Sequence, residues 1–412
     1  MREIALLKNT IQPYPWGSTT SISELLGVPN PGGKPQAELW MGAHPLAPSQ
    51  ARVGDAWVPL DVLIERDPEA MLGPKVAAGF NRRLPFLFKV LAAAAPLSIQ
   101  AHPNREQARE GFERENRQGL PLNAPRRNYR DPNPKPECIC ALTPFWVMCG
   151  FRPPAAILAG LRSLSPRALY AEIGDFAAQC DATGLRRLFA ALLALNSDRR
   201  RQAVDEALSH AARWTDDARV WIAPLARHYP SDIGVLSPAL MNVIRLQPGQ
   251  ALFLAAGVLH SYLEGTGIEI MANSDNVVRG GLTPKPVDIL ELMKLLNFDR
   301  QEIQVVRGDS ISPTEKIYRT PAREFSLSLI ELRGAQAFQS GAARNVEILL
   351  CIYGNAQIRD AASGKNVLEL PQGSSALVPA CAPVYCITGP ARIYKATVPD
   401  PVSVLDKTKR FK

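Results

Sequence analysis

The spacing of apolar residues divides the chain into two textures. From residue 1 to about 150, short apolar runs are separated by Pro, Gly and Asn, a pattern typical of short strands with irregular connections. After Pro153 and Pro154, apolar residues recur with the period of a helix. One stripe comprises Leu185, Leu188, Phe189 and Leu192, and another comprises Val204, Leu208 and Ala211. Residues 154 to about 240 are therefore predicted to form a helical insert.

A β pattern returns after this insert. Residues 243–246 and 251–254 are apolar runs joined by the turn sequence Gln-Pro-Gly-Gln, which predicts two strands and a tight turn. Toward the C-terminus, further short strands are expected at 348–353, 376–379 and 384–387. Because no His follows His260, this C-terminal β unit cannot duplicate a site built on His.

Composition bounds the class of protein. The chain has 412 residues, of which 46% are hydrophobic and 21% charged, so it can bury the cores of two or three packed units and is neither disordered nor fibrous. The formal charge of +8 favours an anionic partner. However, the Lys and Arg residues are scattered and lack the interleaved aromatic residues of a single-strand binding groove. We therefore expect a small anionic substrate and no nucleic acid.

Cysteine usage and the N-terminus indicate the compartment. The seven Cys residues form no even disulfide framework, which fits a reducing environment. Cys138 and Cys140 would share one face of a strand and are expected to be buried packing residues. The N-terminus lacks an apolar region long enough for a signal peptide, and the longest apolar stretch, residues 84–99, is interrupted by Lys89. These features predict a cytoplasmic protein with no membrane association.

Two segments around His residues could carry chemistry. Ser98, Gln100 and His102 alternate, so a strand would place them on one face, either toward a metal or toward solvent. Gly257 precedes His260 and suits a bend that aims this side chain into a cavity. Taken alone, His260 also fits a buried His that is satisfied by hydrogen bonds.

Two polar segments complete the candidate set. Pro134 and Pro136 fix the backbone around Lys135 and Glu137, which suits a rigid site and equally suits an edge strand. Residues 273–285 concentrate polar, charged and Gly residues, as expected for a binding loop on a rigid scaffold or for a solvated surface loop.

Together these segments resemble the type I mannose-6-phosphate isomerases (phosphomannose isomerases), a zinc-dependent family of cupin type. The resembling stretches are residues 12–17, 37–45, 84–90, 97–103, 129–137 and 257–285. The resemblance implies a mainly β fold with a helical insert: two cupin-like (jelly-roll) β units plus an all-α subdomain. It places a catalytic metal-binding domain at 1–153 and 241–320, the helical insert at 154–240, and a C-terminal cupin-like domain without a metal site at 321–412.

The same resemblance implies the metal ligands and the reaction. The implied ligands of one zinc ion are Gln100, His102, Glu137 and His260. One carboxylate among neutral donors leaves the metal net positive charge with which to polarise substrate oxygens. The expected reaction interconverts mannose 6-phosphate and fructose 6-phosphate through a metal-stabilised enediol, with proton transfer between C1 and C2. The expected partner is a small sugar phosphate, and the protein is expected to act as a monomer, with an oligomer left open.

Catalytic roles follow from the charge that develops in this reaction. Arg279 is the first candidate, because a permanent cation can bind the enediolate or the phosphate. Lys135 is the favoured base, through a pKa lowered by desolvation and by the metal, and its competitors are Glu269 and Asp275. Many family members carry His where Pro134 stands here, so a role for that His cannot be transferred to this chain.

Further residues are assigned by the same reasoning. The candidates for holding the phosphate or the sugar hydroxyls are Lys89, Ser98 and Lys285. His44 is interpreted as structural, because no second donor stands near it at the spacing of metal ligands.

Two alternatives belong to other functional classes. A non-catalytic sugar-phosphate-binding cupin is disfavoured by the presence of Lys135, Arg279 and all four ligand candidates. An Fe²⁺ oxygenase would favour two His and one carboxylate with open positions, which a ligand set containing Gln fits poorly.

Overall fold

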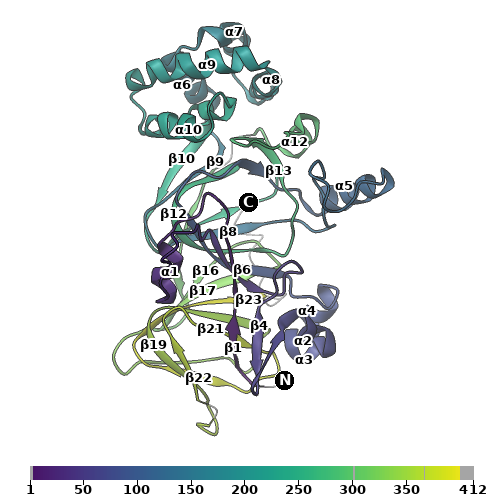
Figure 1. The fold of residues 1–412 in the computed structure, drawn as a ribbon, viewed down its shortest axis with the longest axis vertical. Coiled ribbons are helices and arrows are strands. Elements are labelled where there is room, and N and C mark those ends of the chain that lie inside the picture. Colours follow the sequence, from purple (N-terminus) through teal and green to yellow (C-terminus); the bar gives the residue numbers. More distant parts are fainter. Residues whose placement is uncertain (1–2, 300–301, 366, 400–412) are drawn as a thin grey trace.

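The computed structural model describes residues 3–299, 302–365 and 367–399. It is built from two large antiparallel sheets and a layer of helices, arranged as three tiers along the long axis of the molecule (Figure 1). The expected fold class is thus confirmed. None of the helices in the described part of the chain has the length and apolar character that crossing a membrane requires.

The middle tier is an 11-stranded sheet that holds most of the resembling segments. Its central order is β14-β11-β8-β12-β6-β3-β2, and further strands extend it through β7 and β9. The strands are β2 (Thr10–Gln12), β3 (Glu38–Gly42), β6 (Phe86–Ala93), β7 (Ile99–Ala101), β8 (Glu137–Ala141), β9 (Phe145–Phe151), β10 (Met241–Leu246), β11 (Gln250–Leu254), β12 (His260–Ala272), β13 (Val278–Gly281) and β14 (Val305–Arg307). The long β12 pairs with β6, β7, β8 and β9, so it connects the whole tier.

The second sheet has 12 strands and contains both ends of the described chain. Its strands are β1 (Ala5–Lys8), β4 (Gln50–Val53), β5 (Ala56–Pro59), β15 (Asp309–Ser310), β16 (Glu315–Tyr318), β17 (Ser326–Leu332), β18 (Ala337–Gln339), β19 (Glu347–Asp360), β20 (Leu368–Pro371), β21 (Ser375–Val378), β22 (Tyr385–Thr388) and β23 (Ala391–Thr397). Because β1 pairs with β21 and with β4, three N-terminal strands belong to the sheet that is otherwise C-terminal. Strands from the two ends of the described chain thus lie side by side in one sheet.

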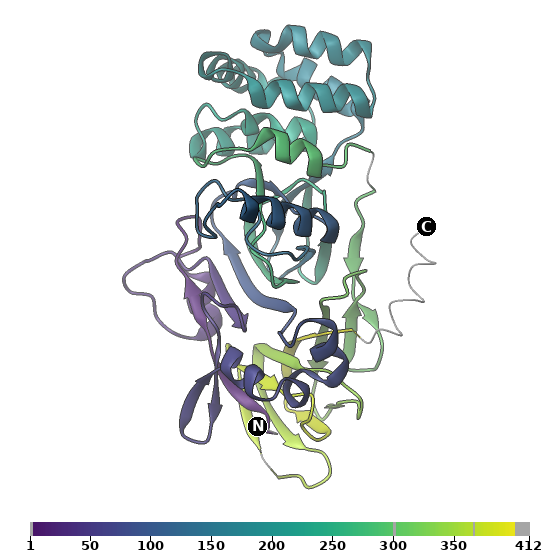
Figure 2. The ribbon, with the colours of Figure 1, turned by 90° about the vertical axis from the view of Figure 1, so that its right-hand side faces the viewer.

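Helices between β9 and β10 form the third tier (Figure 2). They are α6 (Pro154–Leu164), η1 (Arg167–Leu169), α7 (Tyr170–Ala178), α8 (Ala182–Ala194), α9 (Ser197–His210), η2 (Ala211–Arg213), η3 (Asp217–Trp221), α10 (Ile222–His228), η4 (Ile233–Leu236) and α11 (Ser237–Leu240). The apolar stripe predicted on α8 is fully buried in the core of this tier, and Val204 of α9 joins it. Helix α12 (Ile289–Leu295) packs below the tier and contacts α8 and β13.

Five helices lie in the N-terminal region that the sequence pattern assigned to β structure alone. They are α1 (Ser21–Leu26), α2 (Leu60–Arg66), α3 (Pro68–Leu72), α4 (Pro74–Gly79) and α5 (Arg105–Arg117). Helices α1 to α4 are five to seven residues long, too short to show a helical period. Helix α5 is longer but strongly polar, and a capping box between Asn104 and Gln107 starts it.

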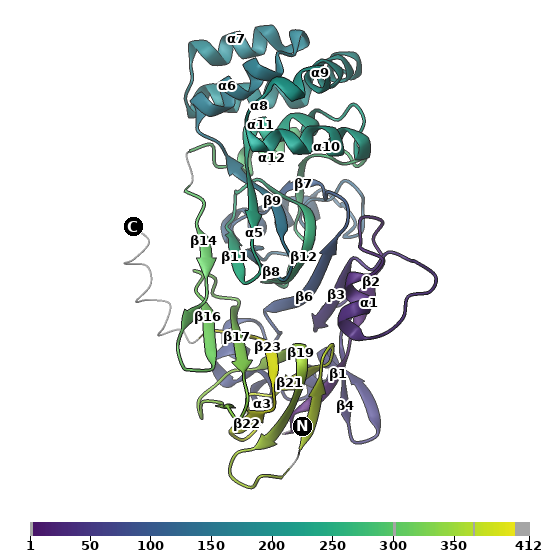
Figure 3. The ribbon, with the colours of Figure 1, turned by 90° about the vertical axis from the view of Figure 1, so that its left-hand side faces the viewer.

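The two sheets share one hydrophobic core. This core includes Phe88 and Cys140 from the middle tier and Ile348 and Tyr394 from the second sheet. The sheets therefore pack on each other through these side chains. Figures 1 and 3 show the two sheets as neighbouring tiers. Cys138 and Cys140 are fully buried in this core, which confirms them as packing residues.

Candidate active site

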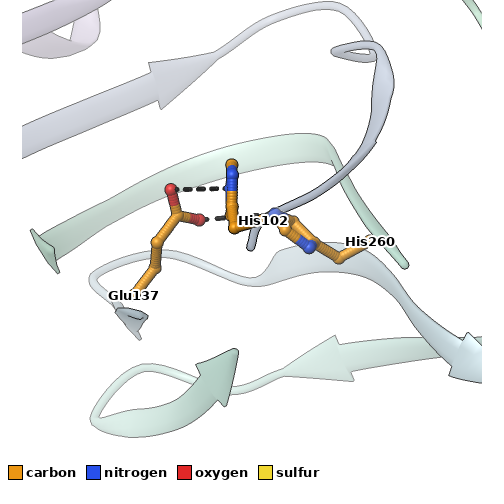
Figure 4. A group of neighbouring side chains, drawn as sticks. All are labelled: His102, Glu137 and His260. Atoms are coloured by element: carbon orange, nitrogen blue, oxygen red, sulfur yellow. Dashed lines mark ion pairs between the residues drawn. The ribbon is translucent and has the colours of Figure 1, made fainter. Parts of the chain in front are cut away.

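Three of the four expected metal ligands converge in the middle tier. His102, Glu137 and His260 come from segments far apart along the chain and point toward one another, with one ligand atom of each within 4.8 Å of the others (Figure 4). Glu137 Oε1 lies 3.1 Å from His102 Nε2, and Oε2 lies 3.3 Å from His260 Nε2. All three side chains are buried. The structure thus brings together three of the residues that the family resemblance implies as ligands, and their role as metal ligands stays a prediction.

The ends of strands place these side chains. Glu137 begins β8, His260 begins β12, and His102 directly follows β7. The turn before His260 depends on Gly257, which has a left-handed φ of +74°, and its N–H donates to the His102 carbonyl over 2.9 Å. This turn thus ties two of the candidate ligands together through the backbone.

Backbone carbonyls orient both imidazoles. His102 Nδ1 lies 2.8 Å from the carbonyl oxygen of Asn276, and His260 Nδ1 lies 2.9 Å from that of Val258. Each Nδ1 must donate its proton to a carbonyl, so each Nε2 is left with a lone pair that faces the centre of the group.

The inward-facing atoms lack hydrogen-bond partners. Within the described residues, His102 Nε2, His260 Nε2 and Glu137 Oε2 are buried and accept no hydrogen bond. Burying such atoms unsatisfied is costly, and a cation coordinated by them would remove that cost. Two imidazole nitrogens and one carboxylate are donors that Zn²⁺ accepts at catalytic sites, so the residues fit the expected metal.

The protonation states of the group also suit a metal. Burial lowers the pKa of His102 to about 4, so its imidazole is neutral at pH 7. Burial alone would raise the pKa of Glu137, but His102 and Lys135 outweigh it and hold this pKa well below its usual range. A neutral imidazole and an ionised carboxylate are the forms that bind metals.

Gln100 stands beside this group. It is the direct register partner of His260 on β12 and of Arg279 on β13, so its side chain leaves the same face of the sheet as theirs. Gln100 is half-buried and lines the cavity described next. Its role as the fourth ligand stays a prediction.

We call His102, Glu137 and His260 the metal group. A cavity of about 700 Å³ opens beside it. Its walls include every catalytic and substrate-binding residue expected from the sequence: Lys89, Ser98, Lys135, Glu269, Asp275, Arg279 and Lys285. Glu137 and Gln100 also line it, so the predicted residues form one site.

Lys89 occupies an anionic part of the wall. Its Nζ lies 3.0 Å from Glu269 Oε2 and 3.4 Å from Glu38 Oε2, and it sits 5.4 Å from the centre of the Trp40 ring. Burial would lower the pKa of Lys89, but the two carboxylates outweigh it and raise this pKa. Because its charge is already neutralised, Lys89 suits hydrogen bonding to sugar hydroxyls better than binding of a phosphate.

A second part of the wall is cationic. The charged groups of the described residues that perturb Arg279 and Lys285 are other cations. Burial, followed by the charge of Arg130, lowers the pKa of Arg279, and Arg279 is the largest cause of the lowered pKa of Lys285. Cations held near one another create a positive potential that an anion relieves.

Asp275 is held as a carboxylate by its surroundings. His44 Nε2 lies 3.3 Å from Asp275 Oδ1, while His44 Nδ1 accepts the Leu46 N–H over 3.3 Å. This arrangement places the imidazole proton on Nε2, where it faces the carboxylate. Burial would raise the pKa of Asp275, but the hydrogen bond from His44 and the charges of Lys135 and Arg130 outweigh it and lower this pKa.

Comparison with known proteins decides the family. Residues 4–154 match the catalytic domain of type I phosphomannose isomerase. The chain is 40% identical over 392 residues to the mannose-6-phosphate isomerase of Escherichia coli K12, covering 94% of this chain and 97% of that protein. It is 34% identical over 381 residues to the Homo sapiens mannose-6-phosphate isomerase, covering 84% of this chain and 87% of that protein. The chain belongs to the type I phosphomannose isomerase family.

Solved structures agree with this membership. A zinc-bound structure of mannose 6-phosphate isomerase has a TM-score of 0.90 at 38% identity and covers 96% of this chain and 99% of its own. A mutant phosphomannose isomerase from Salmonella typhimurium has the same TM-score, identity and coverage. The expected enzyme class, an isomerase of this family, is confirmed, and a non-catalytic cupin is not favoured. The zinc in that relative also supports the expected cofactor.

Several pocket residues of this phosphomannose isomerase were not found from the sequence. Glu38 and Trp40 lie two residues apart on β3, so they share the face of the sheet that meets Lys89. In the sequence, these two side chains with polar groups alternate with apolar residues, and this alternation could have indicated a common face. His44 was interpreted as structural, yet it lies in the cavity wall, paired with Asp275 and apart from the metal group. His228, at the end of α10, brings the helical tier to the rim.

Buried polar contacts hold the two loops that carry Lys135 and Asp275. The Asn276 side chain donates to the carbonyls of Asp131 and Asn133 over 2.8 Å each, and its oxygen accepts the Arg130 N–H over 2.7 Å. Asp131 in turn accepts the Asp275 N–H over 2.8 Å. Nothing in the spacing of these residues along the chain indicated such a clamp.

Proposed function

We propose that this phosphomannose isomerase interconverts mannose 6-phosphate and fructose 6-phosphate with one zinc ion. The observation that carries the proposal is the group of unsatisfied, buried ligand atoms on His102, Glu137 and His260, next to a cavity with separate anionic and cationic parts. A sugar phosphate carries hydroxyls and one dianion, and this cavity offers partners for both.

The cationic part is assigned to the phosphate. Arg279 and Lys285 bind phosphate oxygens, and Ser98 lies close by on the same wall as a hydroxyl donor. The buried Lys89, Glu38 and Glu269 bind and orient the sugar hydroxyls. With its phosphate and its hydroxyls bound at these two parts of the wall, the sugar is held with its reacting carbons toward the metal group.

His102, Glu137, His260 and Gln100 would hold the zinc. When bound, zinc supplies Lewis-acid polarisation of the substrate oxygens. Arg279 also lies beside Gln100 in the sheet register, so its guanidinium can stabilise negative charge as it develops on the sugar.

Proton transfer between C1 and C2 is assigned to Asp275, with Lys135 as its competitor. Asp275 is ionised at neutral pH because His44, Lys135 and Arg130 favour its charged form, so it can accept a proton. Lys135 Nζ lies 3.2 Å from Glu137 Oε1, an arrangement in which the ammonium donates a hydrogen bond. Lys135 is thus better placed to donate to a sugar oxygen, and its role as base stays a prediction.

We further propose a setting and a division into units for this enzyme. It acts in the cytoplasm as a monomer, and the irregular spacing of its seven Cys residues supports the reducing compartment. The units are a metal-binding β domain at 1–153 and 241–320, a helical insert at 154–240, and a C-terminal β domain at 321–412. Residues 400–412 of the last unit lie outside the described residues, and β1, β4 and β5 pair with it.

One experiment tests the function. The purified protein is incubated with mannose 6-phosphate and the formation of fructose 6-phosphate is followed, then the assay is repeated after chelation and after zinc is restored. We expect activity that is lost on chelation and recovered with zinc. Absence of activity in the zinc-loaded protein would sink the proposal, and activity unaffected by complete metal removal would exclude the zinc assignment.

A further inference from the structure

The loop after β13 presents Lys285 to the cavity and begins in an unfavourable backbone conformation. We call residues 282–285 the anion loop; it follows Arg279 and ends in Lys285, and both of these line the cavity. Its first residue, Leu282, has a left-handed φ of +50°, which a Leu rarely adopts. Such a conformation persists only where neighbouring contacts hold it, so the loop needs an external support.

That support comes from the helical tier. Asp232, just before η4, accepts the Thr283 N–H on Oδ2 over 3.1 Å and the Gly234 N–H on Oδ1 over 2.8 Å. Thr283 Oγ1 in turn accepts the Lys285 N–H over 3.1 Å. A single carboxylate therefore bridges the start of η4 and the anion loop, and the loop passes this constraint on to Lys285.

Close packing reinforces the bridge. A Cβ added to Gly234 would lie 2.9 Å from the Leu282 nitrogen, so the backbone of η4 sits directly against the strained residue. The Leu282 side chain is fully buried in the core of the helical tier. On another side of the cavity, Tyr229 donates to the Pro96 carbonyl over 2.6 Å, two residues before Ser98. The helical tier thus contacts two segments that we assign to phosphate binding.

We propose that Asp232 is a positioning residue for substrate binding: it holds the anion loop so that Lys285 reaches the phosphate beside Arg279, which β13 holds through its pairing with β7. The helical tier is then part of the binding machinery of the enzyme. Only the kinetic test of this inference rests on the proposed function. The positioning itself can be tested with any phosphate anion that binds in the cavity.

The test compares two Asp residues of the helical tier in the full-length, zinc-loaded enzyme. Asp181 is the matched control, because it also accepts a Gly N–H at a helix start, from Gly184 over 2.8 Å, but its other oxygen accepts from Gln179 of the same tier, whereas that of Asp232 accepts from the anion loop. For Asp232→Ala we expect KM for mannose 6-phosphate and Ki for inorganic phosphate to rise together by about tenfold, with kcat within about twofold and zinc content unchanged. Asp181→Ala should lower the melting temperature without changing KM or Ki.

A conservative variant sharpens the result. Asp232→Asn keeps one carbonyl oxygen, which can accept one of the two N–H groups, so its KM should fall between those of the wild type and Asp232→Ala. Unchanged KM and Ki in Asp232→Ala would overturn the proposal. An equal rise of KM in Asp181→Ala, or a loss of zinc and kcat together with the rise in KM, would reduce Asp232 to a structural role and overturn it as well.

Failure of the proposed function would be recognised separately. If the wild-type protein does not convert mannose 6-phosphate, the proposed function fails, but calorimetric binding of inorganic phosphate still decides the role of Asp232. Binding that weakens about tenfold in Asp232→Ala and not in Asp181→Ala supports the positioning role. Wild-type protein that does not bind phosphate would overturn it.

Discussion

At the residue scale, the metal group makes the sharpest prediction. His260 supplies one of three converging ligand atoms, and its removal leaves Glu137 and His102 without the second imidazole. We expect His260→Ala to lose zinc during purification, with activity reduced by orders of magnitude, because only one imidazole would remain to bind the metal. Metal analysis and the isomerase assay check this. His228→Ala, which alters an exposed His at the cavity rim, should keep its zinc. Full metal occupancy with unchanged activity in His260→Ala would contradict the ligand assignment.

Replacing Arg279 tests whether its guanidinium stabilises the negative charge that develops on the sugar during catalysis. Arg279→Ala should lower kcat by about 10² to 10³, as removal of a well-placed electrostatic partner does, while circular dichroism and zinc content stay unchanged. Arg130→Ala is the comparison, because Arg130 is an exposed cation at the same part of the cavity and should affect KM more than kcat. Near-normal turnover by the Arg279 variant would remove this residue from the mechanism.

The pairing of His44 with Asp275 predicts a pH dependence. Phe in place of His44 keeps a ring against Trp40, where the two rings meet edge to face at 4.8 Å, but it cannot donate to Asp275. The pKa of Asp275 should then rise from its depressed value toward or above the ordinary 3.8. We expect the acid limb of the kcat profile to move to higher pH in His44→Phe.

The same pairing makes the free energy of unfolding depend on pH in a definite direction. A folded-state pKa below the unfolded value contributes stability that is present above the unfolded pKa and lost as pH falls through the folded one. The loss of unfolding free energy in His44→Phe attributable to Asp275 should therefore be fully present at pH 7 and shrink in strong acid. Urea unfolding at several pH values measures it. An unmoved acid limb would show that Asp275 is not the proton acceptor.

How far the sequence predicts the site depends on where each residue's partners come from. His102, Glu137 and His260 could be named because each lies in an ordered motif with its own turn or Pro residues. Their convergence came from family resemblance, since their spacing along the chain does not specify a common point. The pairing of His44 with Asp275 joins loops 231 positions apart, by the difference of the two numbers, and no local pattern encodes such a contact.

At the element scale, turns decide whether the site forms. The turn between β11 and β12 carries Gly257, where an added Cβ would lie 2.7 Å from the Leu295 carbonyl. We expect Gly257→Ala to destabilise the protein by at least about 1 kcal/mol and to weaken zinc binding, because the turn that aims His260 must shift. Gly249→Ala is a matched control: its φ of +82° is equally left-handed, but a Cβ there meets nothing within 4 Å. This control should lose stability and keep zinc, and equal zinc affinity in both variants would contradict the role of the turn.

The prediction of elements succeeded where turn residues bound apolar runs of strand length. Strands β10, β11, β21 and β22 lie within one or two residues of their expected ranges. The same logic failed for the short helices α1 to α4, because helices of five to seven residues are stabilised by tertiary packing and not by their own periodicity. Helix α5 could have been found from its Asn104–Gln107 capping box.

At the scale of the whole molecule, the pairing of the N-terminal strands was beyond sequence reasoning. Strand β1 pairs with β21, more than 360 residues later, through contacts such as Ala5 with Leu377. The short apolar run of β1 fits a strand but does not indicate its partner. Consequently the two β units are interlocked, because one unit is closed by residues from both ends of the described chain.

This interlocking predicts a single unfolding transition for both sheets. Tyr394 of β23 is fully buried in the shared core, where its hydroxyl lies 3.3 Å from Cys140 Sγ of the middle tier. Replacing such a residue by Ala should cost about 3–5 kcal/mol, by analogy with large aromatic truncations in other cores. We expect Tyr394→Ala to lower the urea midpoint of tryptophan fluorescence and of zinc release together. Five of the six Trp residues lie outside the strands of the mutated sheet, and Trp57 lies on its edge strand β5, so fluorescence reports mainly on the other units. A fluorescence midpoint that stays at the wild-type value would show that the sheets unfold independently.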